Sequence, residues 1–357
     1  MEFYIITWLV CLFCALFYLN KRRVKLYPVI ALTLVLAFFV GFRDDIGIDW
    51  YNYVFFYENG FALDRDGGLY EPLFSALRFL FYLSGFSYQI FFFVLASFSL
   101  LCLTFAAKRM GISNMYLMMF VYISMFFCIM QFNIVRSGIM GSCICVALSY
   151  IHESKKKALI WAFIASGFHY VGLLFIPFIF ILDRKLTKKT IVITIISSYA
   201  IMLLGLGGMF LNIFPFLMKY ERIALFTGSD ALSNGLSIGM IMNLLIFVTC
   251  YYTFNKSYNA DDNYRIVLNT LLLGICICSA LNMFGQIATR AGQVANMSLV
   301  FLWPFIFMKI SKRYRLPVMF VLTAYMAFYF YNPLLDNKKE RDAKLVPYKM
   351  EIVNIRK

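Results

Sequence analysis

The sequence predicts an all-α polytopic integral membrane protein with about ten to twelve transmembrane helices. Two observations support this fold class. Hydrophobic residues make up 62% of the 357-residue chain and charged residues only 14%, against about 45–50% and 25% in soluble domains. The apolar residues also form long unbroken runs, and backbone groups inside hydrocarbon must be hydrogen-bonded within their own segment, which favours helices.

Ten apolar runs are predicted to span the membrane and to form one helical domain over residues 1–332. A C-terminal tail, 333–357, follows the last run. Segment 72–83 is too short to span and is expected to lie at the outer interface. The predicted spans are 3–19, 27–42, 86–107, 114–130, 138–151, 190–212, 238–254, 266–284, 292–308 and 316–332.

The basic residues lie in short clusters between these runs, which is the positive-inside pattern. The loops assigned to the cytoplasm hold 19 Lys and Arg against 4 Asp and Glu. Loop 43–71, with seven acids and two arginines, is then predicted to face out, as are both chain termini. The net charge of +15 therefore reports orientation rather than nucleic-acid binding. The main clusters are Lys21–Lys25, Lys108–Arg109, Lys155–Lys157, Arg184–Lys189 and Lys309–Arg315.

Run 158–182 has basic clusters at both ends, so both ends are expected in the cytoplasm. Its 25 residues are too few for two crossings, which need ~40. The run is therefore predicted to be a re-entrant helical hairpin with its tip near Gly167–Gly172. The alternative is a single crossing, with an error in the assignment elsewhere.

The stretch Arg43-Asp44-Asp45-Ile46-Gly47-Ile48-Asp49-Trp50-Tyr51-Asn52-Tyr53 follows the second predicted span. Charged groups at the edge of hydrocarbon are costly and usually have a partner or a function. Carboxylates beside aromatic rings such as Trp50 and Tyr53 are a common way to bind sugars. The alternative is an ordinary acidic loop with interfacial aromatic residues.

Three arginines, Arg43, Arg136 and Arg290, are predicted at one depth on the outer side. A guanidinium group matches phosphate oxygens in a bidentate geometry, so together these arginines could bind a diphosphate. Alternatively, each pairs with a loop acid or reaches lipid headgroups. His169, at the predicted hairpin tip, could donate to a phosphate oxygen or transfer a proton. Glu71 precedes Pro72 and is either a helix-start carboxylate or a functional group.

Several enzyme signatures are missing from the sequence. It contains no P-loop, GxGxxG or HExxH motif, so cytoplasmic ATP or nucleotide-sugar chemistry is not expected. All nine cysteines lie inside apolar runs, where cysteine behaves as a small hydrophobic residue. Neither a metal nor another cofactor is expected.

The order of these residues resembles a known family. The pattern Arg43…Gly47…Asp49…Tyr53, then Glu71-Pro72, Asn133…Arg136, His169, Arg290 and Pro347-Tyr348, is similar to the EpsG-type group of Wzy-like O-antigen and exopolysaccharide polymerases. The resemblance covers nearly the whole chain through short, degenerate motifs. It implies a GT-C-like glycosyltransferase of the bacterial inner membrane.

The resemblance further implies a reaction on the extracytoplasmic side, between a donor and an acceptor glycan that are both linked to polyprenyl diphosphate. Asp49, or Asp44 or Asp45 in its place, would orient or deprotonate the acceptor hydroxyl. Arg43, Arg136 and Arg290 would offset charge on the diphosphate, with His169 assisting. Glu71, Trp50, Tyr53 and Asn133 would bind sugar. A membrane protein that regulates chain length is a possible partner.

Three other functions stay open at this stage. A ligase or another lipid-linked glycosyltransferase would use the same chemistry with a different acceptor. A membrane O-acyltransferase would need a histidine-led proton relay, for which only His169 is available. A flippase or transporter would show repeated halves with paired broken helices, and no such symmetry is apparent in the sequence.

Overall fold

The computed structural model describes residues 1–21, 24–59, 71–206, 237–282, 285–335 and 345–351. Among these residues, five helices are long and apolar enough to cross a membrane, and six further apolar helices of 10–17 residues accompany them. Many large apolar side chains on the helices are exposed, among them Phe320, which is 74% exposed, and Ile238, which is 72% exposed. Such surfaces need lipid contact, so the chain is an all-α multi-pass membrane protein.

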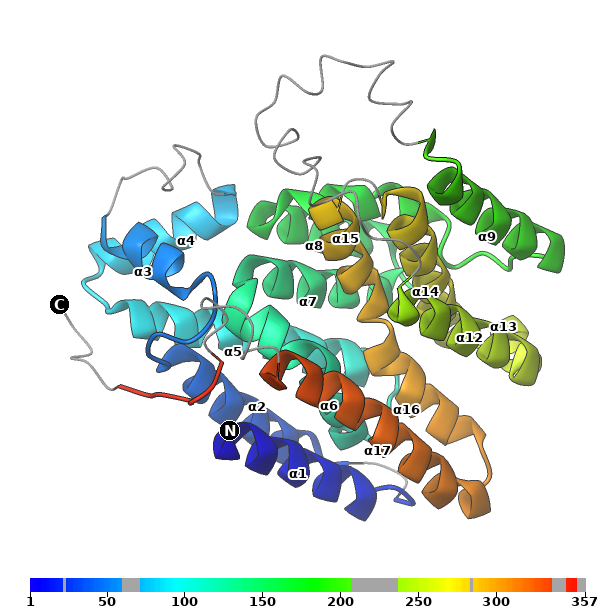
Figure 1. Ribbon diagram of the computed structural model, residues 1–357, viewed down its shortest axis with the longest axis horizontal. Coiled ribbons are helices and arrows are strands. Elements are labelled where there is room, and N and C mark those ends of the chain that lie inside the picture. The colour runs from blue at the N-terminus through cyan, green and yellow to red at the C-terminus, as the bar shows by residue number, and fades with distance from the viewer. Residues whose placement is uncertain (22–23, 60–70, 207–236, 283–284, 336–344, 352–357) are drawn as a thin grey trace.

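The helices follow the apolar runs of the sequence, and Figure 1 shows most of them side by side in one bundle. Parts of the predicted spans 190–212 and 266–284, of loop 43–71 and of the tail lie outside the described residues. The helices at the predicted spans are α1 Glu2–Phe17, α2 Leu26–Gly41, α5 Tyr88–Arg109, α6 Met115–Tyr122, which continues as the π-helix η1 Ile123–Asn133, α7 Val135–Tyr150, α9 Lys188–Leu203, α12 Ile238–Thr253, α14 Asp262–Ala280, α15 Gly285–Asn296, α16 Leu299–Lys309 and α17 Lys312–Leu335.

One predicted boundary is wrong. The sequence suggested a loop around Arg290 and a single span over 292–308, whereas the spanning helix begins earlier, at Ala288, so Arg290 lies inside α15. A tight turn separates α15 from α16: the N–H of Met297 donates to the carbonyl of Val294 at 3.2 Å and the N–H of Val300 to that of Met297 at 3.0 Å. Arg290 is thus held on a helix rather than on a loop.

The chain reverses direction at His169, between α8 (Lys155–Phe168) and the 3₁₀ helices η2 (Tyr170–Phe175) and η3 (Pro177–Phe180). A Cβ at Gly172 would lie 2.9 Å from the backbone nitrogen of Ser166, so a glycine is needed for the returning segment to lie this close to α8. At the other end, the Lys155 ammonium donates to the carbonyl of Ile179 at 2.7 Å and pairs with Asp183 at 2.6 Å. This is the geometry of the predicted helical hairpin; its depth in a bilayer stays a prediction.

Two short helices and residues 345–351 of the tail gather at one end of the bundle, beside the N-terminus (Figure 1). The helices are α3 (Trp50–Glu58) and α4 (Pro72–Leu83). The N–H of Asp44 donates to the carbonyl of Lys349 at 3.1 Å, and the Tyr348 hydroxyl to that of Phe39 at 2.7 Å. The loop after α2 and the tail therefore share one side of the molecule, as the predicted topology requires.

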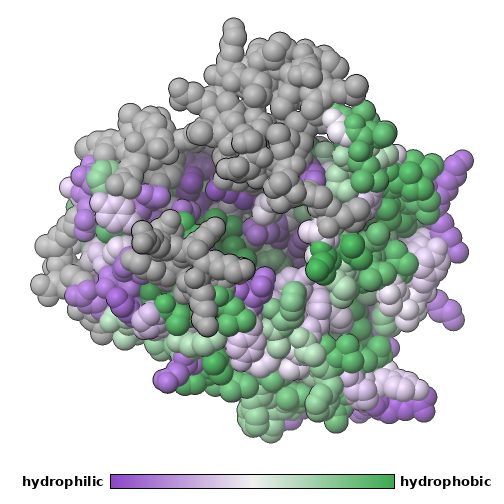
Figure 2. Space-filling model, viewed as in Figure 1, coloured by the Kyte–Doolittle hydropathy of each residue, from purple (hydrophilic) through white to green (hydrophobic). Residues whose placement is uncertain are grey.

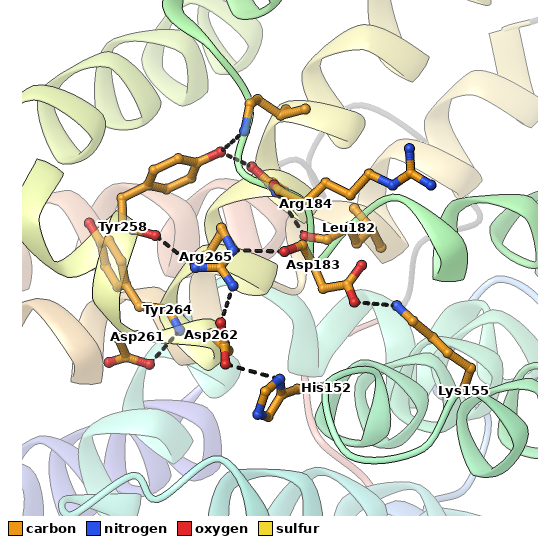
Figure 3. Close-up of polar contacts among 12 residues, drawn as sticks. His152, Lys155, Leu182, Asp183, Arg184, Tyr258, Asp261, Asp262, Tyr264 and Arg265 are labelled. Atoms are coloured by element: carbon orange, nitrogen blue, oxygen red, sulfur yellow. Dashed lines mark hydrogen bonds and ion pairs between the residues drawn. The ribbon is translucent and has the colours of Figure 1, made fainter.

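The opposite end carries a paired polar cluster, drawn in Figure 3. The Arg265 guanidinium donates to the carbonyl of Asp183 at 2.8 Å and to that of Tyr258 at 3.1 Å, and it pairs with Asp262. His152 pairs with the same Asp262 at 2.9 Å. These contacts tie the base of the hairpin to the turn between α13 (Asn255–Ala260) and α14.

Hydrophilic residues are unevenly distributed over the surface in Figure 2. They concentrate toward the two ends of the bundle, with a largely hydrophobic surface between them. A hollow in the face shown also has hydrophilic residues on its walls. This division of polar and apolar surface suits a protein that is surrounded by a bilayer.

Candidate active site

The loop after α2 is shaped by Arg43, whose side chain is completely buried. Its guanidinium donates to three backbone carbonyls: Val40 at 2.7 Å, Ile46 at 3.1 Å and Phe132 at 3.4 Å. The group also lies about equally close to the rings of Phe92 and Phe132, 5.2 and 5.4 Å from their centroids. Arg43 was expected to bind a diphosphate, but the structure places it inside the protein, where it fixes the loop.

Gly47 and Asn133 attach the same loop to the end of η1. Gly47 has a φ of +100°, and a Cβ there would lie 2.1 Å from the carbonyl oxygen of Phe132. The N–H of Ile48 donates to the Asn133 side-chain oxygen at 3.1 Å. Asn133, expected to bind sugar, therefore has its acceptor engaged by the loop. The combined effect of these contacts is to hold the following residue, Asp49, in a defined place.

Glu71 joins two other predicted residues. Its Oε2 accepts from Arg136, and its Oε1 lies 3.7 Å from His169 Nδ1. Oε1 also accepts from the N–H of Tyr170 at 3.3 Å. The Glu71 side chain is only 4% exposed, so both carboxylate oxygens are taken up by protein groups. The structure thus places Glu71 as a positioning residue rather than as the sugar ligand that was expected.

The local structure around these groups explains their positions. Pro72 occupies the first turn of α4, a position that suits its fixed backbone angle, and this places Glu71 at the helix cap. Arg136 lies in the first turn of α7, directly after η1 ends. A π-helix of 11 residues is unusual, and such segments often occur at functional sites.

His169 links this group to α15. It lies at the hairpin tip, and its Nδ1 accepts from the N–H of Val171 at 3.3 Å. Its other ring nitrogen, Nε2, lies 3.3 Å from Nη1 of Arg290. Because Nδ1 accepts a hydrogen bond, a neutral ring carries its proton on Nε2. Nε2 and the Arg290 guanidinium are then both donors, so their 3.3 Å contact is not a hydrogen bond, and both N–H groups can donate to a common acceptor. The hairpin tip therefore lies between Glu71 and Arg290.

Asp49 lies near the same arginines. Its carboxylate is not used to cap α3, although Asp49 holds the N-cap position. Burial raises the pKa of this carboxyl group, and the charges of Arg290 and Arg136 oppose that rise. The sequence predicted Asp44, Asp45 or Asp49 as the catalytic acid. Of these three, Asp49 is the one that interacts electrostatically with both arginines. Asp44 instead interacts electrostatically with Tyr88, at the side of the loop that faces the tail.

Two aromatic residues of this region, Trp50 and Tyr53, are packed against protein. Tyr53 is 4% exposed, and burial raises the pKa of its hydroxyl group, while the hydrogen-bonded Arg136 opposes that rise. Trp50 packs edge-on against Tyr88, with 6.0 Å between the ring centroids. Asp45 has a φ of 48° at the turn of the loop. Tyr53 therefore supports Arg136, and Trp50 supports the position of the loop.

The arrangement brings together groups from five separate parts of the sequence. Within the described ranges, no three His, Cys, Asp or Glu side chains come together as a metal site would require. The group offers two guanidinium ions for an anionic ligand, one imidazole as a hydrogen-bond donor and one carboxylate that can accept a proton. The five residues are Asp49, Glu71, Arg136, His169 and Arg290.

The fold and the site define a multi-pass helical membrane protein with a cluster of two arginines, two acids and a histidine at one end of its bundle. The sequence model of the EpsG family matches residues 25–350, which include every residue of this cluster, and the chain belongs to that family. Membership makes it a polysaccharide polymerase-like membrane protein. No curated protein and no solved structure matches the chain.

Proposed function

We propose that the protein polymerises lipid-linked glycans by moving a growing chain from one polyprenyl-diphosphate carrier onto the terminal sugar of another lipid-linked unit. The observation that supports this is the contact series Arg136–Glu71–His169–Arg290, with Asp49 in electrostatic reach of both arginines. It places phosphate-binding groups beside a potential base. That combination is what glycosyl transfer from a diphosphate requires.

The proposed reaction needs no external energy source, because the donor bond is already activated by its leaving group. The oxygen of the acceptor hydroxyl forms a bond to the anomeric carbon of the donor. The bond from that carbon to the diphosphate breaks, and its electron pair leaves with the diphosphate. The acceptor proton passes to Asp49, which acts as a general base.

Arg136 and Arg290 would bind the diphosphate and offset the charge that develops on it as the bond breaks. Arg136 is oriented for this by Glu71, and the described contacts of Arg290 leave it without an acid within ion-pair distance. His169, located between Glu71 and Arg290, can donate from Nε2 to a phosphate oxygen. Asp49 forms no described ion pair with either arginine, so its carboxylate is available to accept the proton.

An apolar groove on the lipid-facing side suits the carrier chain. It has a volume of about 480 Å³. Its walls come from the returning 3₁₀-helical segment of the hairpin, beginning at Leu174, and from α9 and α14, ending at Leu281. Leu174 follows His169 by five residues, so the groove begins near the polar cluster. A polyprenyl chain could lie there while its diphosphate reaches the arginines.

We place the reaction on the outer side of the bacterial inner membrane. The charge distribution of the loops supports this orientation, because the polar cluster lies at the end of the bundle that carries loop 43–49 and the tail. The end with the Lys and Arg clusters then faces the cytoplasm. Lipid-linked glycans would reach the cluster after transfer across the membrane.

Reconstitution tests the proposal directly. The purified protein, placed in proteoliposomes with purified polyprenyl-diphosphate repeat units, is expected to produce a ladder of glycan lengths on gels. A ligase would give one transfer to a different acceptor and no ladder. A flippase would move intact units between leaflets without joining them. Absence of both the ladder and carrier diphosphate release would refute the proposed reaction.

A further inference from the structure

A second cavity, partly lined by polar side chains, lies next to the cluster described above. It has a volume of about 300 Å³ and is enclosed by η1, α12, α14, α15, α16 and α17. Pockets for small ligands begin at about this size, which leaves room for one sugar residue rather than for a whole repeat unit. Most of its wall is apolar, as in a typical ligand site.

The polar part of this wall consists of three amide side chains, Asn243, Gln293 and Asn296. The side-chain oxygen of each is buried and has no hydrogen-bond partner. Asn243 is itself only 8% exposed. Leaving one buried polar atom unpaired costs about 1–3 kcal/mol. A rotation of about 180° around the last side-chain bond exchanges the oxygen and the nitrogen of an amide, so each of these side chains can turn a donor or an acceptor toward a ligand in the cavity.

The neighbouring helices are shaped to accept these amides. Gly274 on α14 leaves space for Asn296, since a Cβ at Gly274 would lie 2.7 Å from the Asn296 oxygen. Gln293 follows Arg290 by three residues on α15, and Asn296 follows it by six. With a rise of about 1.5 Å per residue, the amides lie within ~9 Å of Arg290 along the helix axis. The cavity thus begins about one turn from the proposed diphosphate site.

We propose that this cavity binds a sugar residue of the lipid-linked glycan, so that Asn243, Gln293 and Asn296 determine which repeat unit is accepted. The inference rests on the proposed function for the identity of the substrate. Amide groups both donate and accept hydrogen bonds, as sugar hydroxyls do, and they carry no charge, which suits a neutral polyhydroxylated ring. The apolar part of the wall would contact the faces of the ring.

Binding can be measured without any polymerisation. The probe is the repeat-unit oligosaccharide, cut from the host strain's own polysaccharide and freed of its carrier, with maltotriose as the control sugar. Calorimetry on the full chain in nanodiscs is expected to show binding of the oligosaccharide and not of maltotriose. Asn243→Leu and Gln293→Met, which keep the side-chain size, should each weaken binding about tenfold.

These two variants also separate binding from stability. Replacing a buried unpaired amide with an apolar group of similar shape should leave the melting temperature of the unliganded protein unchanged or raise it. Lower melting temperatures would show that the amides serve the fold and would overturn the inference. Unaltered oligosaccharide affinity in both variants would overturn it as well.

Gly239 provides a test that keeps all three amides. It lines the cavity, and a Cβ there would lie 3.7 Å from the Tyr329 hydroxyl oxygen, in ordinary contact. Gly239→Leu should therefore fold normally, fill part of the cavity and abolish oligosaccharide binding. Gly239→Ala is the matched control and should bind as the original protein does.

The outcomes distinguish this inference from the proposed function. If the oligosaccharide binds and Gly239→Leu abolishes the binding, but lipid-linked units yield no ladder, the proposed polymerase activity is wrong and the sugar site stands. If a ladder forms and Gly239→Leu has the same KM for the lipid-linked repeat unit as the original protein, the sugar site is wrong and the polymerase stands. Failure of the oligosaccharide to bind the unmodified protein also overturns the sugar site.

Discussion

Both ends of the bundle carry charged side chains at least partly buried in the protein, but the partners of these side chains differ between the two ends. At the end shown in Figure 3, each acid has a basic partner within the protein, and Arg265 donates to two carbonyls and one carboxylate. Lys155 and Lys309 likewise pair with Asp183 and Asp261. At the other end, Arg290 has a histidine nitrogen as its described partner, and Asp49 is in no described ion pair.

This difference separates structural charges from charges held for a ligand. A buried guanidinium that is surrounded by carbonyls and acids has its hydrogen-bond donors satisfied by the fold. A guanidinium that faces a histidine and a distant acid still has donors to offer. We therefore expect substitutions at the end drawn in Figure 3 to lower stability, and substitutions in the opposite cluster to lower activity while the protein stays folded.

Asp49→Asn should have the largest effect on activity. The amide cannot accept the acceptor proton, and loss of a general base costs about 10²–10⁴-fold in rate. Initial rates of chain extension in proteoliposomes measure this effect. Asp44→Asn is the matched control in the same loop and should retain most activity. If Asp44→Asn were the inactive variant, the choice of Asp49 as the base would be wrong.

Arg290→Gln and Arg265→Gln test the comparison itself. Removing Arg290 should lower the turnover rate about 10²–10³-fold by loss of charge stabilisation on the leaving diphosphate, with no loss of thermal stability. Removing Arg265 should instead cost about 1–3 kcal/mol of folding free energy, because it leaves the carbonyls of Asp183 and Tyr258 without their hydrogen-bond donor.

Both variants are compared in the same assays, with Arg313→Gln as the control on an exposed arginine of α17. Membrane-inserted yield and melting in detergent report stability, and the glycan ladder reports activity. The division between the two ends fails if Arg290→Gln unfolds the protein, or if Arg265→Gln is fully stable but inactive.

Gly47→Ala should lower activity without removing any reactive group. Its φ of +100° is strained for an alanine, and the new Cβ would collide with the carbonyl of Phe132. The loop must then shift and carry Asp49 with it, and a displacement of about 1 Å can cost ~10²-fold in rate. Gly85→Ala, also at a positive φ of 72° but with open space around it, is the control. Equal activity in both variants would argue against a positioning role for Gly47.

The helices and most residues of the candidate site could be predicted from the sequence, because apolar runs and isolated charged residues between them are strong signals. Asp49, Arg136, His169 and Arg290 were predicted to converge, and they lie together. The role of Arg43 could not be predicted, since its partners are backbone carbonyls that only the tertiary fold brings close. The polar residues around Arg290 look like a loop because they lower the local hydrophobicity.

The choice among the acids and the amide-lined cavity also required the structure. Asp44, Asp45 and Asp49 lie within six residues, and only the folded loop separates their surroundings. Asn243, Gln293 and Asn296 are single amides in different helices, with no spacing that marks them as a group. Their unpaired oxygens become informative only after the neighbouring side chains are in place.

The smallest expected effect is a shift in the pH dependence of the reaction. Because burial raises the pKa of Asp49, activity should fall with decreasing pH at values above those of an ordinary aspartate, about 3.9. Arg290 opposes this rise, so in Arg290→Gln the residual activity should already fall at a higher pH. Arg290→Lys keeps the positive charge, so its activity should fall at the same pH as in the original protein. Since the folded pKa exceeds the unfolded one, Asp49 contributes stability below its unfolded pKa and loses it as pH rises through the folded value. Initial rates in proteoliposomes across a pH series measure this fall in activity. If the rate falls at the same pH in the original protein and in Arg290→Gln, the ionising group is not Asp49.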